Sequence, residues 1–89
     1  MTYRVLLHQR AAEFLERCDE RLRLRVKKRL RELEKEPEEK GRRLKHSPFW
    51  RLRIGSHRAI YMIDKDEGRV VVLFIGHRRD VYEDFSRLF

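Results

Sequence analysis

The chain has 89 residues, which is enough for one domain with a modest core and too few for two. It carries 23 lysine and arginine residues against 15 aspartate and glutamate residues, and the resulting net charge of +8 favours a polyanionic partner. A single cysteine excludes an internal disulfide, and the lack of a long apolar run or a signal-peptide pattern predicts a cytoplasmic protein with no membrane partner.

A strand and two helices are predicted in the first part of the chain. Residues 3–7 are rich in β-branched and aromatic side chains and predict a short strand. Apolar residues at helical spacing then predict two amphipathic helices, with Asp19 as the N-cap of the second and Pro37 as its end. The two stripes consist of Ala11, Phe14, Leu15 and Cys18, and of Leu22, Val26, Leu30 and Leu33. These helices should form a hairpin with a basic outer face.

The second half predicts a meander of three strands. Residues 38–47 are polar and predict a loop, and strands follow at 49–54, 57–63 and 69–75 with short turns between them. Residues 81–89 repeat apolar side chains at helical spacing and predict a short C-terminal helix. The whole is one α+β domain over residues 1–89: a small, mainly antiparallel sheet in the order β-α-α-β-β-β, with the helical hairpin packed on it.

Arginines alternate with apolar residues on the first strand of this meander. In a strand, Arg51 and Arg53 leave one face while Leu52 and Ile54 leave the other, so one face is predicted to be core and the other cationic. Further cations and aromatic residues follow at Arg58, in residues 76–79 and at Tyr82. Four scattered histidines and one cysteine make no metal site, and no cofactor is predicted. Guanidinium, imidazole and phenol groups without metal ligands are suited to binding RNA and to cutting it.

The order of elements, together with three short segments, resembles the RelE/ParE superfamily of toxin–antitoxin systems. The segments are Trp50-Arg51-Leu52-Arg53, Arg58 to Tyr61, and Gly76-His77-Arg78 followed by Val81-Tyr82. The resemblance is strongest to the RelE branch of ribosome-dependent messenger-RNA interferases. It implies metal-independent cleavage of messenger RNA in the ribosomal A site, by attack of the ribose 2′-hydroxyl on the adjacent phosphate. It also implies two partners, the ribosome with its message and a RelB-like antitoxin that wraps the toxin.

The resemblance assigns roles to individual residues. Arg58 matches an arginine that stabilises the transition state, Arg78 one that acts on the leaving group, and Tyr82 a tyrosine that stacks on or orients the nucleotide. Arg53 stands where the best-known members have a lysine that serves as general base, and an arginine gives up a proton very reluctantly. We therefore expect catalytic roles for Arg53, Arg58, Arg78 and Tyr82, and RNA contacts from three further residues. These are Arg51, His77 and Arg79.

Several alternatives stay open from the sequence. The missing base is either His57 or His77, or it is not needed because Arg53 stabilises the alkoxide electrostatically. The arginines of the strand could be a solvated face, and Arg58 and Arg78 could pair with Asp80, Glu83 or Asp84. A ParE-type toxin that poisons DNA gyrase has the same fold, although that branch generally lacks this set of basic and aromatic residues. A non-catalytic RNA-binding regulator is the third alternative.

Overall fold

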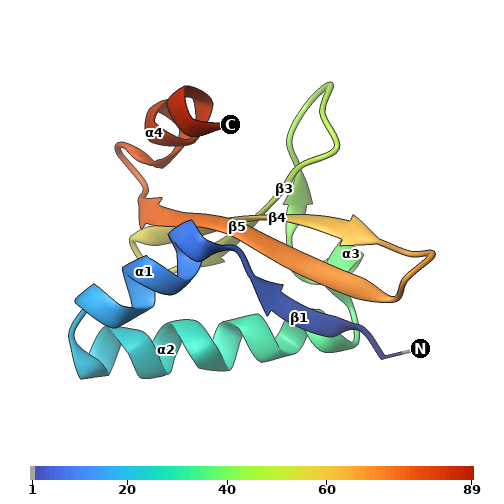
Figure 1. The fold of residues 1–89 in the computed structure, drawn as a ribbon, viewed down its shortest axis with the longest axis horizontal. Helices are drawn as coiled ribbons and strands as arrows, with labels where there is room; N and C mark the ends of the chain where they lie inside the picture. The colour runs from blue at the N-terminus through green and yellow to red at the C-terminus, as the bar shows by residue number, and fades with distance from the viewer. Residues whose placement is uncertain (1) are drawn as a thin grey trace.

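A five-stranded sheet with helices on both sides makes up the computed structural model, which describes residues 2–89 (Figure 1). In chain order the elements are β1 (Arg4–Leu7), α1 (Gln9–Arg17), α2 (Glu20–Arg31), the 3-10 turn η1 (Glu32–Glu34), α3 (Pro37–Lys40), β2 (Arg42–Arg43), β3 (Trp50–Ile54), β4 (His57–Asp64), β5 (Arg69–His77) and α4 (Val81–Leu88). The predicted α+β fold is confirmed.

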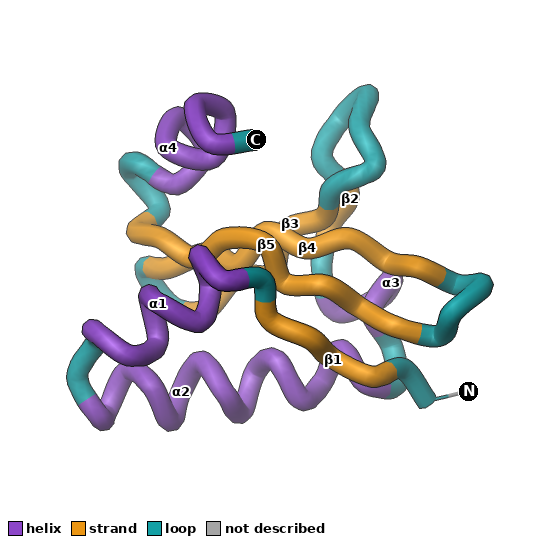
Figure 2. The backbone as a smooth tube through the Cα atoms, in the orientation of Figure 1, coloured by secondary structure: helices purple, strands orange, loops and turns teal. Residues whose placement is uncertain are grey.

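The strands lie in the order β1-β5-β4-β3-β2, so the meander of β3, β4 and β5 forms the middle of the sheet (Figure 2). All neighbouring pairs are antiparallel except β1 and β5, which run parallel with Arg4 opposite Arg69. The apolar strand β5 is therefore an interior strand, as its composition predicted. It extends two residues beyond the predicted end at Ile75, so Gly76 and His77 belong to the sheet.

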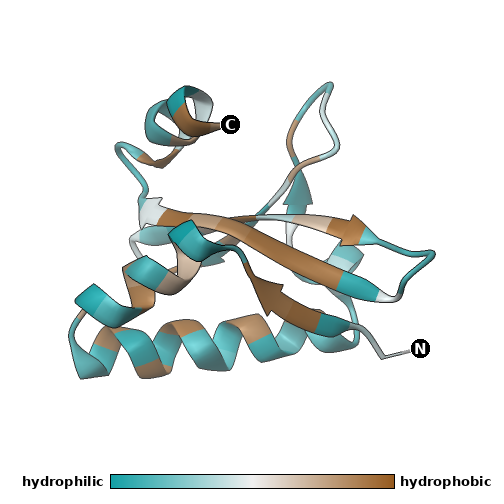
Figure 3. Ribbon diagram, viewed as in Figure 1, coloured by the Kyte–Doolittle hydropathy of each residue, from teal (hydrophilic) through white to brown (hydrophobic). Residues whose placement is uncertain are grey.

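One face of the sheet is closed by α1 and α2, which lie below the strands in Figure 1. Apolar side chains of the two helices meet apolar side chains of the strands there, and the brown segments of Figure 3 show both contributions. The buried residues of this core are Tyr3, Ala11, Leu15, Val26, Leu30, Leu33, Leu52, Ile54, Ala59, Tyr61, Val70, Val72 and Ile75. At roughly 25 cal/mol per Å² of apolar surface, this burial is the main stabilising term of the fold.

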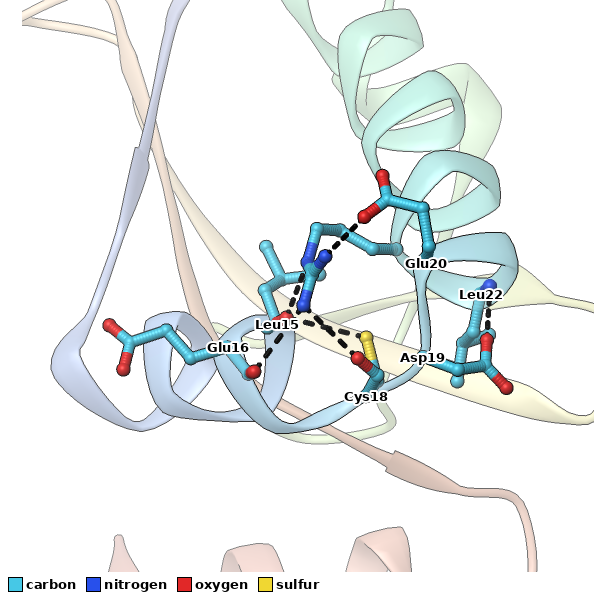
Figure 4. A network of polar contacts seen from close by, with 7 residues as sticks. Leu15, Glu16, Cys18, Asp19, Glu20 and Leu22 are labelled. Carbon is cyan, nitrogen blue, oxygen red and sulfur yellow. Dashed lines mark hydrogen bonds and ion pairs between the residues drawn. The ribbon is translucent and has the colours of Figure 1, made fainter.

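The predicted hairpin of α1 and α2 is joined by polar contacts at its turn (Figure 4). Asp19 is the N-cap of α2, and its Oδ1 accepts from the N–H of Leu22 at 2.8 Å. From the first turn of α2, the guanidinium of Arg23 reaches back to α1 and donates to the carbonyls of Leu15 (2.7 Å) and Cys18 (3.1 Å). These carbonyls at the end of α1 have no backbone partner within the helix, so Arg23 satisfies them and ties the two helices together at the turn.

Two predictions around Pro37 are wrong. The helix α2 ends at Arg31 and passes into the turn η1, whereas Pro37 begins α3, where a first-turn proline loses no hydrogen bond. The segment 38–47, predicted as a loop, contains most of α3 and all of β2. It is anchored by the buried Tyr61, whose hydroxyl donates to the carbonyl of Pro37 at 2.6 Å. Burial raises the pKa of this hydroxyl, which keeps it protonated and able to donate.

On the other face of the sheet lies α4, the predicted C-terminal helix. Its residues Val81 and Phe85 pack on Ile60 and Leu73 in a second, smaller core. The helix comes close to the sheet at Gly76, where a Cβ atom would lie only 3.3 Å from Val81. Of the helices within residues 2–89, none is both long and apolar enough to cross a membrane.

Candidate functional site

The register between β3 and β4 determines which side chains share the face opposite α1 and α2. Arg53 pairs with Arg58, and Leu52 pairs with Ala59. Leu52 and Ala59 are fully buried under the helices, so the alternation of side chains places Arg51, Arg53 and Arg58 on the opposite face. This is the placement that the alternating strand sequence predicted.

These arginines line a hollow of about 290 Å³, which we call the cationic hollow. Its lining consists of Lys40, Gly41, Arg42, Arg51, Arg53 and Arg58. Within the described residues 2–89, none of those that line it is acidic. Arg42 lies opposite Arg51 in the β2–β3 pair, so like charges stand side by side without a protein counterion in the lining. Such a site attracts an anion with several oxygens, and a phosphodiester is one.

Lys40 and Arg42 were missed as site residues because their segment was predicted to be a loop. They reach the hollow because the backbone of Gly41 packs tightly on the sheet. A Cβ atom there would overlap the hydroxyl of Tyr61 and the carbonyl of Arg51. The only signal in the sequence is a glycine surrounded by basic residues in 40–43, which by itself indicates no particular site.

Tyr82 lies at the rim of the hollow. It projects from the first turn of α4, and its hydroxyl is 3.3 Å from Nη1 of Arg51, close enough to accept a hydrogen bond. Tyr82 is 36% exposed, so part of this aromatic residue is open to solvent. An exposed aromatic ring beside a phosphate-binding group is the arrangement that stacks a nucleobase.

Arg58 and Arg53 are held by backbone contacts at the β3–β4 turn. Nη1 of Arg58 donates to the carbonyls of Gly55 (2.9 Å) and His57 (2.8 Å), which orients its guanidinium. The carbonyl of Arg53 accepts two bonds from Arg29 of α2, at 3.0 and 2.9 Å, while the Arg53 side chain is exposed. Arg29 thus joins α2 to the edge of β3 beyond the short strand β2.

Arg78 and Arg79 follow β5 in an exposed turn and do not line the cationic hollow. The N–H of Arg78 donates to the carbonyl of Ser56 at 2.8 Å, which ties this turn to the β3–β4 turn that holds Arg58. The structure therefore brings together Arg51, Arg53, Arg58 and Tyr82, with Arg78 in the adjoining turn. Among the ion pairs within residues 2–89, none includes Arg58 or Arg78, so the alternative of surface salt bridges to Asp80, Glu83 or Asp84 is not supported.

The two histidines considered as general bases lie on the other face of the sheet. His57 pairs with the buried Ile54 and with His77, and its ring is 5.7 Å from that of Phe14 in α1 and 5.4 Å from that of His77. Burial lowers the pKa of His57, and the charges of His77, Arg25 and Arg58 lower it further. A histidine base in the cationic hollow therefore has no geometric support. Within residues 2–89, no group of three or more histidine, cysteine or acidic side chains could hold a metal ion.

Comparison with known proteins gives a consistent result. A family model described as the ParE toxin of the type II toxin–antitoxin system parDE matches residues 5–82. A search of curated proteins finds no sequence match.

Solved structures match over most of the chain. The RelBE toxin–antitoxin complex of Mycobacterium tuberculosis has 27% identity and a TM-score of 0.78, over 88% of this chain and 100% of that chain. An archaeal RelE–RelB complex from Pyrococcus horikoshii has 25% identity and a TM-score of 0.76, over 88% and 97%. A mutant of the Escherichia coli toxin RelE in the free state has 23% identity, a TM-score of 0.79 and full coverage of both chains, and shows the shared fold.

Proposed function

The chain belongs to the RelE/ParE superfamily of type II toxin–antitoxin toxins, and from this premise we propose that it is a ribosome-dependent endoribonuclease. It cleaves messenger RNA in the ribosomal A site, without a metal ion, by attack of a ribose 2′-hydroxyl on the adjacent phosphate. The products are a strand ending in a 2′,3′-cyclic phosphate and a strand beginning with a 5′-hydroxyl.

The cationic hollow is the observation that carries this proposal. Negative charge builds up on the phosphate oxygens as the 2′-oxygen attacks, and guanidinium groups aimed at that charge lower the barrier. Arginine keeps its charge throughout the reaction because it does not titrate in the physiological range. Arg51, Arg53 and Arg58 supply such groups from two adjacent strands, which hold them more rigidly than a loop would.

The residues take different roles in this proposal. Arg58 stabilises the transition state, Arg53 stabilises the developing alkoxide, and Arg78 acts on the leaving oxygen from the adjoining turn. Tyr82 stacks on a base at the rim. Arg51 and Arg79 contact the RNA. His77 is a further proposed RNA contact, made from outside the hollow, because it lies at the end of β5 on the helix face.

A second candidate function is inhibition of DNA gyrase. It is favoured by the family model that matches, since that model is named for the ParE toxin of parDE. A third candidate is RNA binding without cleavage, because Arg53 cannot act as a base. Both would use the same basic surface, and neither requires the arginines to be aimed at a reacting phosphate.

We propose a RelB-like antitoxin as the protein partner. The M. tuberculosis, P. horikoshii and Methanococcus jannaschii relatives were crystallised as complexes with antitoxins. A net charge of +8 favours a partner with an acidic, partly disordered region that folds on this surface. Co-expression with the product of the adjacent small open reading frame is expected to restore growth. Failure of any neighbouring product to bind would count against this partner.

One experiment separates the three functions. Purified protein is added to ribosomes programmed with a defined message, and the cut sites are mapped by primer extension. The same preparation is assayed for inhibition of gyrase supercoiling. We expect cuts at the A-site codon only when ribosomes are present, and no effect on gyrase. Gyrase inhibition without cleavage would instead identify a ParE-type toxin, and binding of the message without either activity would identify a regulator.

A further inference from the structure

We propose that Lys40 is the proton acceptor of the cationic hollow and takes the proton of the attacking 2′-hydroxyl. This inference rests on the proposed function, because it supplies the base that Arg53 cannot be.

Lys40 is singled out by the chemistry of the lining. Apart from Gly41, every other residue that lines the hollow is an arginine, and an arginine does not release its proton in proteins. The amine of a lysine does, and it can then accept a proton from a hydroxyl. The histidines lie on the opposite face, and Tyr82 stands at the rim with its hydroxyl against Arg51. Within residues 2–89, Lys40 is therefore the one lining side chain able to cycle between the two forms.

The backbone around Lys40 is fixed to the sheet. It is the last residue of α3, and its N–H donates to the carbonyl of Glu36 at 3.0 Å. The preceding turn is held by the bond from Tyr61 to Pro37, and the following Gly41 packs on the carbonyl of Arg51. The base of the side chain is thus set against the arginine strand.

The side chain itself is free to reposition. Its Nζ lies 3.9 Å from Oε1 of Glu32, and the two side chains are 41% and 35% exposed. An exposed ion pair at this distance contributes little stability, so the ammonium can leave it when RNA enters. Glu32 also binds Arg29 at 2.7 Å, and that pair remains when Lys40 moves.

Charged groups of both signs surround Lys40. From η1, the carboxylate of Glu32 lies 3.9 Å from the Lys40 ammonium. Four guanidinium groups line the same hollow. These are Arg42 from β2, Arg51 and Arg53 from β3, and Arg58 from β4. On the same short segment as Lys40, the neighbouring charged groups are Glu36, Glu38 and Glu39.

The proposed step balances without a co-reactant. After leaving Glu32, the Lys40 ammonium releases a proton to the solvent. The proton of the 2′-hydroxyl then passes to the free amine at Nζ as the 2′-oxygen forms its bond to phosphorus. The bond between phosphorus and the 5′-oxygen breaks, and that oxygen takes a proton from water. Lys40, again an ammonium, can then return to its pair with Glu32.

The test is the pH dependence of single-turnover cleavage on programmed ribosomes. Lys40→Arg keeps the positive charge but removes the acceptor, so we expect a loss of roughly 100-fold or more with ribosome binding unchanged. Lys65→Arg is the matched control, because Lys65 lies in the β4–β5 turn outside the hollow, and it should cleave at the wild-type rate. Cleavage by Lys40→Arg at the wild-type rate would overturn the proposal.

A second variant gives a positive readout. In a Cys18→Ala background, Lys40→Cys is alkylated with bromoethylamine to give a thioether amine, which is a weaker base than lysine. We expect alkylation to restore cleavage and to move the rising limb of the pH profile to lower pH. Restored cleavage with an unmoved limb would mean that Lys40 supplies only charge. If the unmodified wild-type protein does not cut the message at all, the proposed endoribonuclease function is wrong. If the wild-type protein cuts and Lys40→Arg cuts equally fast, only the role of Lys40 is wrong.

Discussion

The two faces of the sheet differ although the same strands build both. On β3, Leu52 and Ile54 are buried under α1 and α2, whereas Arg51 and Arg53 line the cationic hollow on the other side. One face is closed by two helices and a large apolar core, and the other carries one short helix and a smaller core. A single alternating sequence thus encodes stability in every second residue and charge in the residues between.

The comparison also explains how the chain tolerates its crowded cations. Repulsion among the guanidinium groups of the hollow opposes folding, and burial on the helix face offsets it. The helix face even supports the strand edge directly, since Arg29 of α2 donates to the carbonyl of Arg53. Substitutions on the helix face should therefore change stability, and substitutions on the hollow face should change activity.

The largest effect is expected for Leu52→Ala on the helix face. Leu52 is fully buried, so truncation removes apolar contacts and leaves a cavity that costs about 2–5 kcal/mol of unfolding free energy. Urea denaturation followed by circular dichroism measures it. Arg53→Ala, one residue along the strand, is the matched control and should stay within about 0.5 kcal/mol of the wild type. An equal loss of unfolding free energy in both variants would mean that the hollow face contributes to stability as much as the helix face does.

Arg58→Ala on the hollow face is expected to reduce activity and to leave stability nearly unchanged. Removing its guanidinium should slow ribosome-dependent cleavage by roughly 100-fold or more, because charge stabilisation of the phosphate is lost. The exposed part of the side chain faces the hollow and not the core, so the unfolding curve should change little. An Arg58→Ala protein that is unfolded by circular dichroism would make this arginine structural and the assigned role wrong.

A smaller effect should appear as a pH dependence of stability from His57 on the helix face. Its pKa is lowered in the folded protein by burial and by nearby cations, so the unfolded chain binds the proton more tightly. Stability contributed by the neutral imidazole is present above the ordinary value of about 6.5 and declines as the pH falls below it. Urea midpoints between pH 5 and 8 measure this decline, and His57→Gln should flatten it. An unchanged slope in that variant would assign the decline to other groups.

The smallest effect is expected for Arg87→Ala on the outer surface of α4. Arg87 pairs with Glu83 at 2.8 Å, but the two side chains are 69% and 71% exposed. Exposed pairs of this kind contribute about 0.3–0.5 kcal/mol in a helix, so stability and cleavage should both stay near the wild-type values. A large loss of cleavage would place the outer surface of α4 around Arg87, and not only Tyr82 in its first turn, in contact with the ribosome or the message.

Local patterns were enough to predict four of the five strands and the helical hairpin, but not the short strand β2. The alternation of arginine and apolar residues from Arg51 to Ile54 shows which side chains share a face of the sheet. Asp19 before an apolar stripe marks the start of a helix. The region around Pro37 could not be predicted in this way, because a proline is compatible with the end of one helix and with the first turn of the next.

The composition of the site was predictable only in part. Lys40 and Arg42 enter the hollow through the contact of Gly41 with Tyr61 and the Arg51 carbonyl, residues far from it in sequence. His57 is adjacent to Arg58 in the chain but points to the opposite face, which depends on where β4 begins. Tertiary packing and strand register, which are not local properties, decided these positions.

The parallel pairing of β1 with β5 sets the order in which the fold can be completed during translation. Val5 pairs with Val70 and Leu7 with Val72, so the first strand waits for one of the last segments to be synthesised. At about 5–20 residues per second, that wait lasts several seconds, during which the apolar stripes of α1 and α2 have no sheet to cover. The five-stranded sheet is therefore incomplete until β5 has been made, and translation that stops before β5 leaves β1 without its partner strand. The interval also gives an antitoxin already present in the cell time to meet the toxin as it folds.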